Sequence, residues 1–103
     1  MADIYVIYGM PKDSKAFDDY YVNTHTPLVR KMPKLRELKV SKGPVTVVGI
    51  EREIYLTARL TFASMADLQE SMGSDEGKAV ANDVPNYATG GVEIIVVETF
   101  DAL

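Results

Sequence analysis

The last strand-like segment of the chain is apolar on both of its faces, and this limits the folds that the chain can adopt. Side chains alternate along a strand, so Val92, Ile94 and Val96 are expected to share one face. Ile95 and Val97 are then expected to share the other face. A two-sided apolar strand is normally covered on both sides, because it otherwise leaves an apolar patch in water. The fold must therefore place this strand between two covering layers.

Four segments have the β-branched, aromatic or alternating pattern of strands. They are Ile4–Tyr8, Leu35–Ser41, Ile54–Phe62 and Val92–Phe100. The third is the clearest, because apolar and polar side chains alternate over most of its length. The connection over residues 43–53 matches no regular element.

A first helix is predicted between the first two strands. Asp13 or Ser14 can accept a hydrogen bond from a free N–H group of its first turn. Pro27 has no N–H group, so a kink or restart is expected there, with Thr26 as a possible new N-cap, and Pro33 should end the helix. Its predicted apolar face, spaced by four and seven residues, consists of Phe17, Tyr21, Leu28 and Met32.

Two shorter helices are predicted between the third and fourth strands. Ser64 and Ser74 can each cap one of them, Gly73 ends the first, and the second ends before Pro85. The order of elements is then β-α-β-β-α-β. This order predicts an α+β, ferredoxin-like fold, in which helices cover one face of a four-stranded antiparallel sheet. Residues 1–103 are expected to form a single domain, near the commonest domain size.

The uncovered face of this sheet predicts a homodimer. The first strand is also two-sided, since Tyr5 and Ile7 alternate with other apolar residues. The remaining chain offers nothing to cover the face opposite the helices. A symmetric pair can bury one such patch on both subunits at once, so we expect two subunits to pack sheet against sheet.

Composition excludes several classes of function. The chain has no cysteine, so it has neither a thiolate nucleophile nor a cysteine-based metal site. Six of the eleven basic residues lie between Arg30 and Lys42, but that span has no aromatic residue and the net charge is −4, which argues against a nucleic-acid partner. No apolar run approaches the roughly 20 residues of a membrane-spanning helix, and no secretory signal is evident. A cytoplasmic protein with no nucleic-acid or membrane partner is expected.

His25 is the only histidine, and it is the leading candidate for chemistry. A lone histidine without cysteine makes a metal site improbable, so neither metal nor cofactor is expected. An imidazole with a pKa near ~6.5 can exchange protons at neutral pH. Tyr21 lies one helical turn earlier and can hold an oxyanion beside it, whereas Tyr20 fits less well. We therefore predict His25 and Tyr21 as catalytic residues.

Tyr87 and Tyr8 are the predicted ligand-binding residues. Tyr87 can approach His25 from the loop before the last strand, and Tyr8 ends the first strand. The competing interpretation is structural. A single histidine beside an apolar helix face can simply hydrogen-bond a backbone carbonyl, with Tyr21 in the core.

Two separated motifs lie in register along the chain. The first is Phe17-x-x-x-Tyr21-x-x-x-His25-x-Pro27-Leu28. The second is Ser74-x-Glu76-Gly77, followed by Asp83, Tyr87-Ala88-Thr89-Gly90-Gly91 and the apolar last strand. Together they resemble the EthD family of small dimeric α/β-barrel proteins. The resemblance implies a ferredoxin-like dimer with its sheets facing, and a cleft between each sheet and its helices. By this resemblance His25 and Tyr21 would line the cleft.

The resemblance does not imply one reaction. The founding member is associated with ether degradation beside a cytochrome P450 system, and relatives include muconolactone isomerases, polyketide cyclases, cofactor-free monooxygenases and haem-degrading enzymes. We expect a cofactor-free isomerase, lyase or cyclase acting on a small hydrophobic carbonyl or phenolic compound, in ether or aromatic catabolism. The alternative is a non-catalytic binding or accessory protein for a partner oxygenase. Haem binding through His25 is a third and weaker hypothesis.

Overall fold

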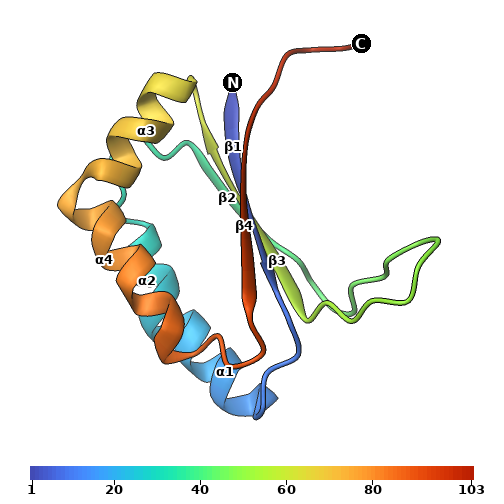
Figure 1. Ribbon diagram of the computed structural model, residues 1–103. Coiled ribbons are helices and arrows are strands. Elements are labelled where there is room, and N and C mark those ends of the chain that lie inside the picture. The colour runs from blue at the N-terminus through green and yellow to red at the C-terminus, as the bar shows by residue number, and fades with distance from the viewer.

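All 103 residues are described by the computed structural model, in which helices cover one side of a four-stranded antiparallel sheet (Figure 1). The strands are β1 (Ala2–Tyr8), β2 (Glu37–Val40), β3 (Leu56–Phe62) and β4 (Val92–Glu98). The helices are α1 (Ser14–Tyr20), a π-helical turn (Tyr21–His25), α2 (Thr26–Val29), α3 (Met65–Gly73), α4 (Asp75–Asp83) and a 3₁₀ turn (Val84–Asn86). The spatial order of strands is β2-β3-β1-β4. The β-α-β-β-α-β prediction is confirmed.

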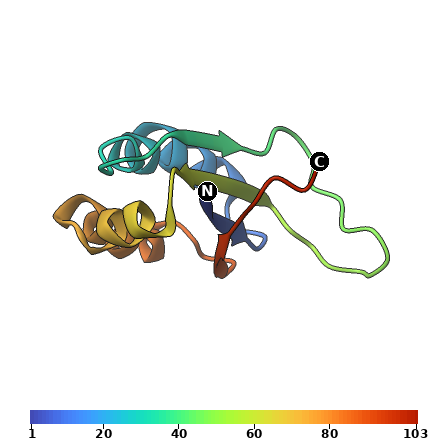
Figure 2. The ribbon, with the colours of Figure 1, turned by 90° about the horizontal axis from the view of Figure 1, so that it is seen from above.

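The sheet has one face toward the helices and one open face, as Figure 2 shows from above. Along β1, Ile4 and Tyr8 point to the helices and are almost fully buried. Ile4 pairs with Leu60 of β3 and with Val96 of β4, so these three side chains share the helix-facing side of the sheet, although Val96 on the edge strand β4 is still 43% exposed. The hydrophobic core lies between this face and the helices, and residues from both layers form it.

The first helix begins as predicted, and its regular α-helical pattern is interrupted just before Pro27. The Asp13 side chain accepts a hydrogen bond from the N–H of Ala16 and caps α1. The helix then continues through a π-helical turn, in which the N–H of Thr26 bonds to the carbonyl of Tyr21. Thr26 is therefore a helical residue and not an N-cap. The wider turn accommodates Pro27, whose ring and missing N–H disfavour a regular α-helical turn.

The π-helical turn also changes which residues face the core. Phe17, Tyr21 and Met32 are buried as predicted, but Val29 is buried in place of Leu28. The extra residue in the turn moves the buried position of α2 from Leu28 to Val29, so the regular spacing is wrong within α2, while Met32 beyond the helix is still buried. The helix ends at Val29, before Pro33.

The hairpin of helices α3 and α4 follows the predicted caps. Ser64 accepts a hydrogen bond from Asp67 N–H, and Ser74 accepts one from Gly77 N–H. Gly77 lies so close to the preceding helix that an added Cβ would meet the Ser71 carbonyl oxygen at 2.1 Å. Only glycine permits this approach, which brings α3 and α4 together above the sheet.

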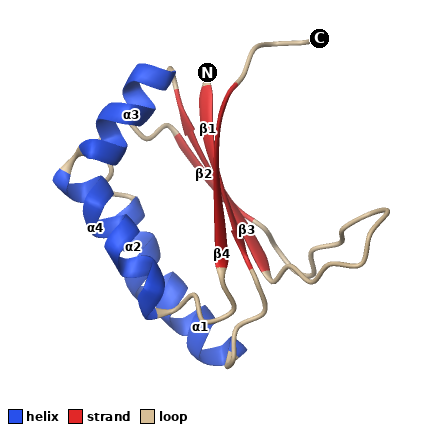
Figure 3. Cartoon of the chain, in the orientation of Figure 1, coloured by secondary structure: helices blue, strands red, loops and turns tan.

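Figure 3 shows the four strands in red. β2, β3 and β4 are shorter than predicted, whereas β1 begins earlier than predicted, at Ala2. β4 stops at Glu98 because Glu98 pairs with Ala2, the first residue of β1. β3 begins at Leu56, which pairs with Tyr8 at the end of β1. Residues 41–55 form an irregular arm that projects from the sheet on the side away from the helices. None of the helices is long and apolar enough to cross a membrane.

Candidate functional site

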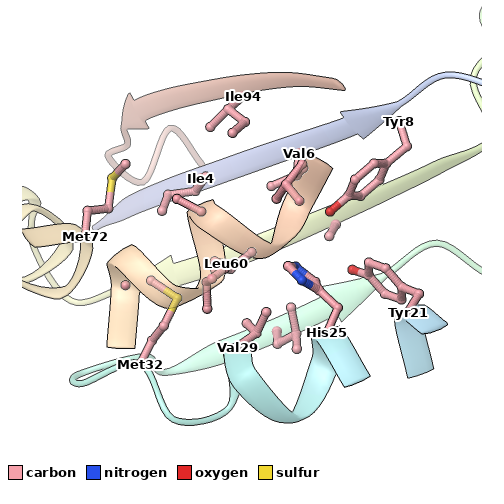
Figure 4. Close-up of a pocket in the computed structure, with 16 residues that line it drawn as sticks. Ile4, Val6, Tyr8, Tyr21, His25, Val29, Met32, Leu60, Met72 and Ile94 are labelled. Carbon is pink, nitrogen blue, oxygen red and sulfur yellow. The ribbon is translucent and has the colours of Figure 1, made fainter. Parts of the chain in front are cut away.

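A cavity lies between the helices and the covered face of the sheet (Figure 4). Its volume is about 90 Å³, and 14 of its 16 lining residues are hydrophobic. Strands β1 and β3 form its floor, and helices α2 and α4 form much of its opposite wall. His25, Tyr21 and Tyr8 bring polar atoms to this otherwise apolar lining. Binding sites for small molecules have this character: mostly apolar, with a few placed polar groups.

His25 is held by a carboxylate that is distant in the sequence. Its Nδ1–H donates a hydrogen bond of 2.9 Å to Oδ2 of Asp83, at the end of α4. Both side chains are at least nine-tenths buried. The bond fixes the tautomer of the ring, so the unprotonated nitrogen is Nε2. No protein group bonds to Nε2, and His25 projects into the cavity (Figure 4).

Asp83 collects three hydrogen bonds. Besides His25, the Tyr20 hydroxyl donates to its Oδ1 at 2.5 Å, and the Asn86 amide donates to the same oxygen at 3.0 Å. Burial raises the pKa of this carboxyl, but the bonds from Tyr20, Asn86 and His25 outweigh it and hold the pKa below its ordinary value. Asp83 is therefore a carboxylate at neutral pH.

His25 is neutral at neutral pH. Burial lowers the pKa of its imidazole below the ordinary 6.5, and this outweighs the opposing effect of Asp83. The ring thus presents a free lone pair on Nε2. When Nε2 accepts a proton, the Asp83 carboxylate at Nδ1 stabilises the imidazolium. This is the arrangement of a general base held in place by an acidic partner.

Tyr8 and Tyr21 place hydroxyl groups at the same end of the cavity (Figure 4). Burial raises the pKa of Tyr8 to about 12 and raises that of Tyr21 further. Both phenols therefore keep their protons at neutral pH and can donate hydrogen bonds. No protein group bonds to the Tyr21 hydroxyl, so its hydrogen is free for a ligand. The ring centres of Tyr21 and His25 are 5.5 Å apart.

Tyr87 lies outside the cavity lining. Its hydroxyl shares a 2.5 Å hydrogen bond with that of Tyr8, and its ring centre is 4.6 Å from that of His25. When Tyr87 donates this bond, the hydrogen of Tyr8 is free to point at a ligand. Of the four residues predicted from sequence, His25, Tyr21 and Tyr8 thus line the cavity, whereas Tyr87 contacts them from outside the lining.

Asp83 and Tyr20 are the site residues that the sequence reasoning missed. Asp83 is 58 residues from His25, so its contact depends on the packing of α4 beside α2. Two signals pointed to Asp83: it belongs to the second EthD-like motif, and an acidic residue at the end of a helix opposes the helix dipole. Tyr20 does not line the cavity, but its hydroxyl donates a hydrogen bond to Asp83. No group of three acidic, histidine or cysteine side chains is arranged to hold a metal ion.

Comparison with known proteins shows the family of this chain. The profile of the EthD domain matches residues 11–91, which include His25, Asp83 and Tyr87. The chain belongs to the EthD family. An uncharacterized 11.0 kDa protein of Rhodococcus erythropolis, from the thcB-thcC intergenic region, is 33% identical over 98 residues, covering 95% of this chain and 94% of its own.

Solved structures support the same assignment. An EthD family protein of Bacillus halodurans is 35% identical, with a TM-score of 0.86 over 97% of this chain and 99% of that one. A protein of Bacteroides fragilis, described as dimeric with a ferredoxin-like fold, is 13% identical, with a TM-score of 0.63 over 95% of both chains. The second likeness concerns the fold alone. Dimeric proteins thus occur among the structural neighbours of this EthD domain.

Proposed function

We propose that this EthD protein is a cofactor-free enzyme that moves a proton on a small hydrophobic carbonyl or phenolic compound. The reaction class is that of an isomerase, lyase or cyclase, in the catabolism of ethers or aromatic compounds. One observation carries the proposal: a neutral His25, oriented by the Asp83 carboxylate, turns its free Nε2 into an apolar cavity. A histidine with a purely structural role is expected to bond through both ring nitrogens, whereas Nε2 lies unbonded beside the free hydroxyl of Tyr21.

His25, Tyr21 and Asp83 are sufficient for a complete proton transfer. The lone pair on His25 Nε2 accepts a proton from an acidic C–H or O–H bond of the substrate. The bonding electrons move toward the substrate oxygen, and the Tyr21 hydroxyl donates a hydrogen bond to the resulting oxyanion. The imidazolium is stabilised by Asp83 and then returns the proton to another carbon, which completes an isomerisation.

The test is a screen for proton transfer. The isomerisation of β,γ-unsaturated γ-lactones would be followed by ultraviolet absorbance, and deuterium uptake by aryl alkyl ketones in D₂O by NMR. We expect His25→Ala to lower the rate roughly 10²- to 10⁴-fold, the usual contribution of a general base. Val22→Ala, on the exposed side of the same helix, is the matched control and should not change the rate. An unchanged rate in His25→Ala would overturn the proposal.

The alternative is a non-catalytic binding protein for a partner oxygenase, favoured by the largely apolar lining of the cavity. The two functions separate in the same experiment. Binding of the lactones and ketones without turnover, in both the native protein and His25→Ala, would support the alternative. Turnover that depends on His25 would exclude it.

The open face of the sheet is the proposed homodimer interface. Tyr5 and Ile95 pair across β1 and β4 on this face and are 36% and 42% exposed. Arg59 Nε and Thr61 Oγ1 lie buried on the same face without a hydrogen-bond partner, and a second subunit could satisfy them. Sedimentation should show a dimer at micromolar concentration that Ile95→Asp dissociates. A native protein that sediments as a monomer would overturn this interface.

A further inference from the structure

The cavity has a polar end and an apolar end. The His25 ring and the hydroxyls of Tyr8 and Tyr21 converge at one end, while Met72 and Met32 lie at the other (Figure 4). A buried polar group of a ligand needs a hydrogen-bond partner, and the lining side chains offer one only at the first end. A bound molecule must therefore place its polar atoms there and its apolar part along the rest of the cavity.

The lining also restricts the charge of the ligand. It contains no Asp, Glu, Lys or Arg side chain. A permanently charged group would lose its hydration without gaining a partner ion, which is unfavourable. A neutral molecule with one weakly acidic proton avoids this cost, because it becomes charged only by giving that proton to His25.

The cavity reaches solvent between the helices and the edge strand. Most lining residues are buried, but three are exposed: Met72 of α3, Ala81 of α4 and Ile94 of β4. Met72 and Ile94 are 41% and 51% exposed although they line the cavity. These three residues therefore form its mouth. β4 is the edge strand on this side of the sheet, so no further strand closes the opening.

We propose that the ligand is a neutral, weakly acidic phenol or enolisable carbonyl compound with an unbranched apolar tail. Its polar head lies at His25, Tyr21 and Tyr8, and its tail runs along β1 toward Met72, Ala81 and Ile94. Met72 lies at the mouth and sets how much of the tail is buried before the tail reaches water. The distance along β1 from Ile4 to Tyr8 is about 13 Å at strand spacing, which suits a short tail. This inference rests on the proposed function for the role of the head and extends it to the shape of the substrate.

The tail site is tested by measuring the affinity of the protein for 4-alkylphenols, from 4-methylphenol to 4-octylphenol, by calorimetry. Affinity should rise about fourfold for each methylene that is buried and should level off once the tail reaches Met72. Met72→Ala removes apolar cover at the mouth and should move this levelling point to shorter tails, whereas Met72→Phe adds cover and should move it to longer ones. Met65→Ala is the matched control, because Met65 lies on the same helix but does not line the cavity.

A second pair of variants tests the mouth. Ala81→Phe should weaken the binding of the longer alkylphenols at least tenfold, while Ala79→Phe on the same helix, outside the cavity, should leave it unchanged.

The polar head of the ligand is tested by comparing 4-butylphenol with butylbenzene, and the phenol should bind at least tenfold more tightly. Equal chain-length profiles in the native protein and both Met72 variants, or equal binding of phenol and hydrocarbon, would overturn the proposal.

These outcomes separate the inference from the proposed function. A chain-length profile that shifts with Met72, in a protein that shows no proton transfer, would keep the ligand class and remove the catalysis. Proton transfer that depends on His25 but ignores tail length and Met72 would keep the catalysis and remove the tail site.

Discussion

The two faces of the sheet are built from the same strands but differ in how they are completed. On the covered face, Ile4, Tyr8 and Phe62 are between 0% and 4% exposed, and helices from this chain close the core over them. On the open face, Tyr5 and Ile95 stay partly exposed.

This difference separates the site from the assembly. The groups proposed to carry chemistry come from one chain, through α1, the π-helical turn, α4 and β1. The open face contributes none of the cavity lining, because the lining residues of β1 are Ile4, Val6 and Tyr8. We therefore expect changes on the covered face to affect stability and activity, and changes on the open face to affect association.

The largest expected effect is on stability, from a matched pair of truncations. Phe62→Ala should lower the free energy of unfolding by about 3–5 kcal/mol, because it leaves a cavity in a fully buried part of the core. Ile95→Ala should cost the monomer less than half as much, since its side chain is already partly in water. Urea denaturation measures both losses, at a protein concentration low enough to favour monomers. Similar losses would show that the two faces are covered equally.

A smaller effect is expected at the carboxylate that holds His25. Asp83→Asn keeps an oxygen that can accept the Nδ1–H bond but removes the charge that stabilises the imidazolium. The pKa of His25 should fall further below 6.5, because the hydrogen bond and charge of Asp83 both raise it. The rate should fall roughly 10- to 100-fold, as for other residues that support a reactive group. NMR titration of the ring checks the pKa, and an upward shift would contradict the network.

The smallest effect is the pH dependence of the native protein. The pKa of His25 is lower in the folded state than the 6.5 of the unfolded chain, so the unfolded chain binds the proton more readily. Stability should therefore be complete above pH 6.5 and decline as the pH falls below it. Activity should decline over the same acidic range as Nε2 becomes protonated, with a midpoint below 6.5. Urea midpoints and rates measured across pH 4.5–8 check both, and His25→Ala should remove this part of the stability profile.

Much of the fold could be predicted because the signals were local. Asp13, Ser64 and Ser74 cap helices through bonds to residues three positions away, which a sequence pattern can describe. Composition predicts where the strands lie but not where they end. β4 ends at Glu98 and β3 begins at Leu56, because these residues pair with the two ends of β1. The predicted buried face of the first helix is wrong in α2, because the π-helical turn before it changes the register of the side chains.

The sequence by itself determined the strand and helix order, the lone imidazole with its neighbouring phenol, and a sheet with two apolar faces. These follow from side-chain periodicity and composition, which act over a few residues. Only the tertiary structure decided that Asp83 holds His25, that Tyr20 holds Asp83, and that Tyr8 and Tyr21 share the cavity. Those contacts join residues on separate elements, and they form only when the helices pack on the sheet, because that packing brings the groups together and removes them from water.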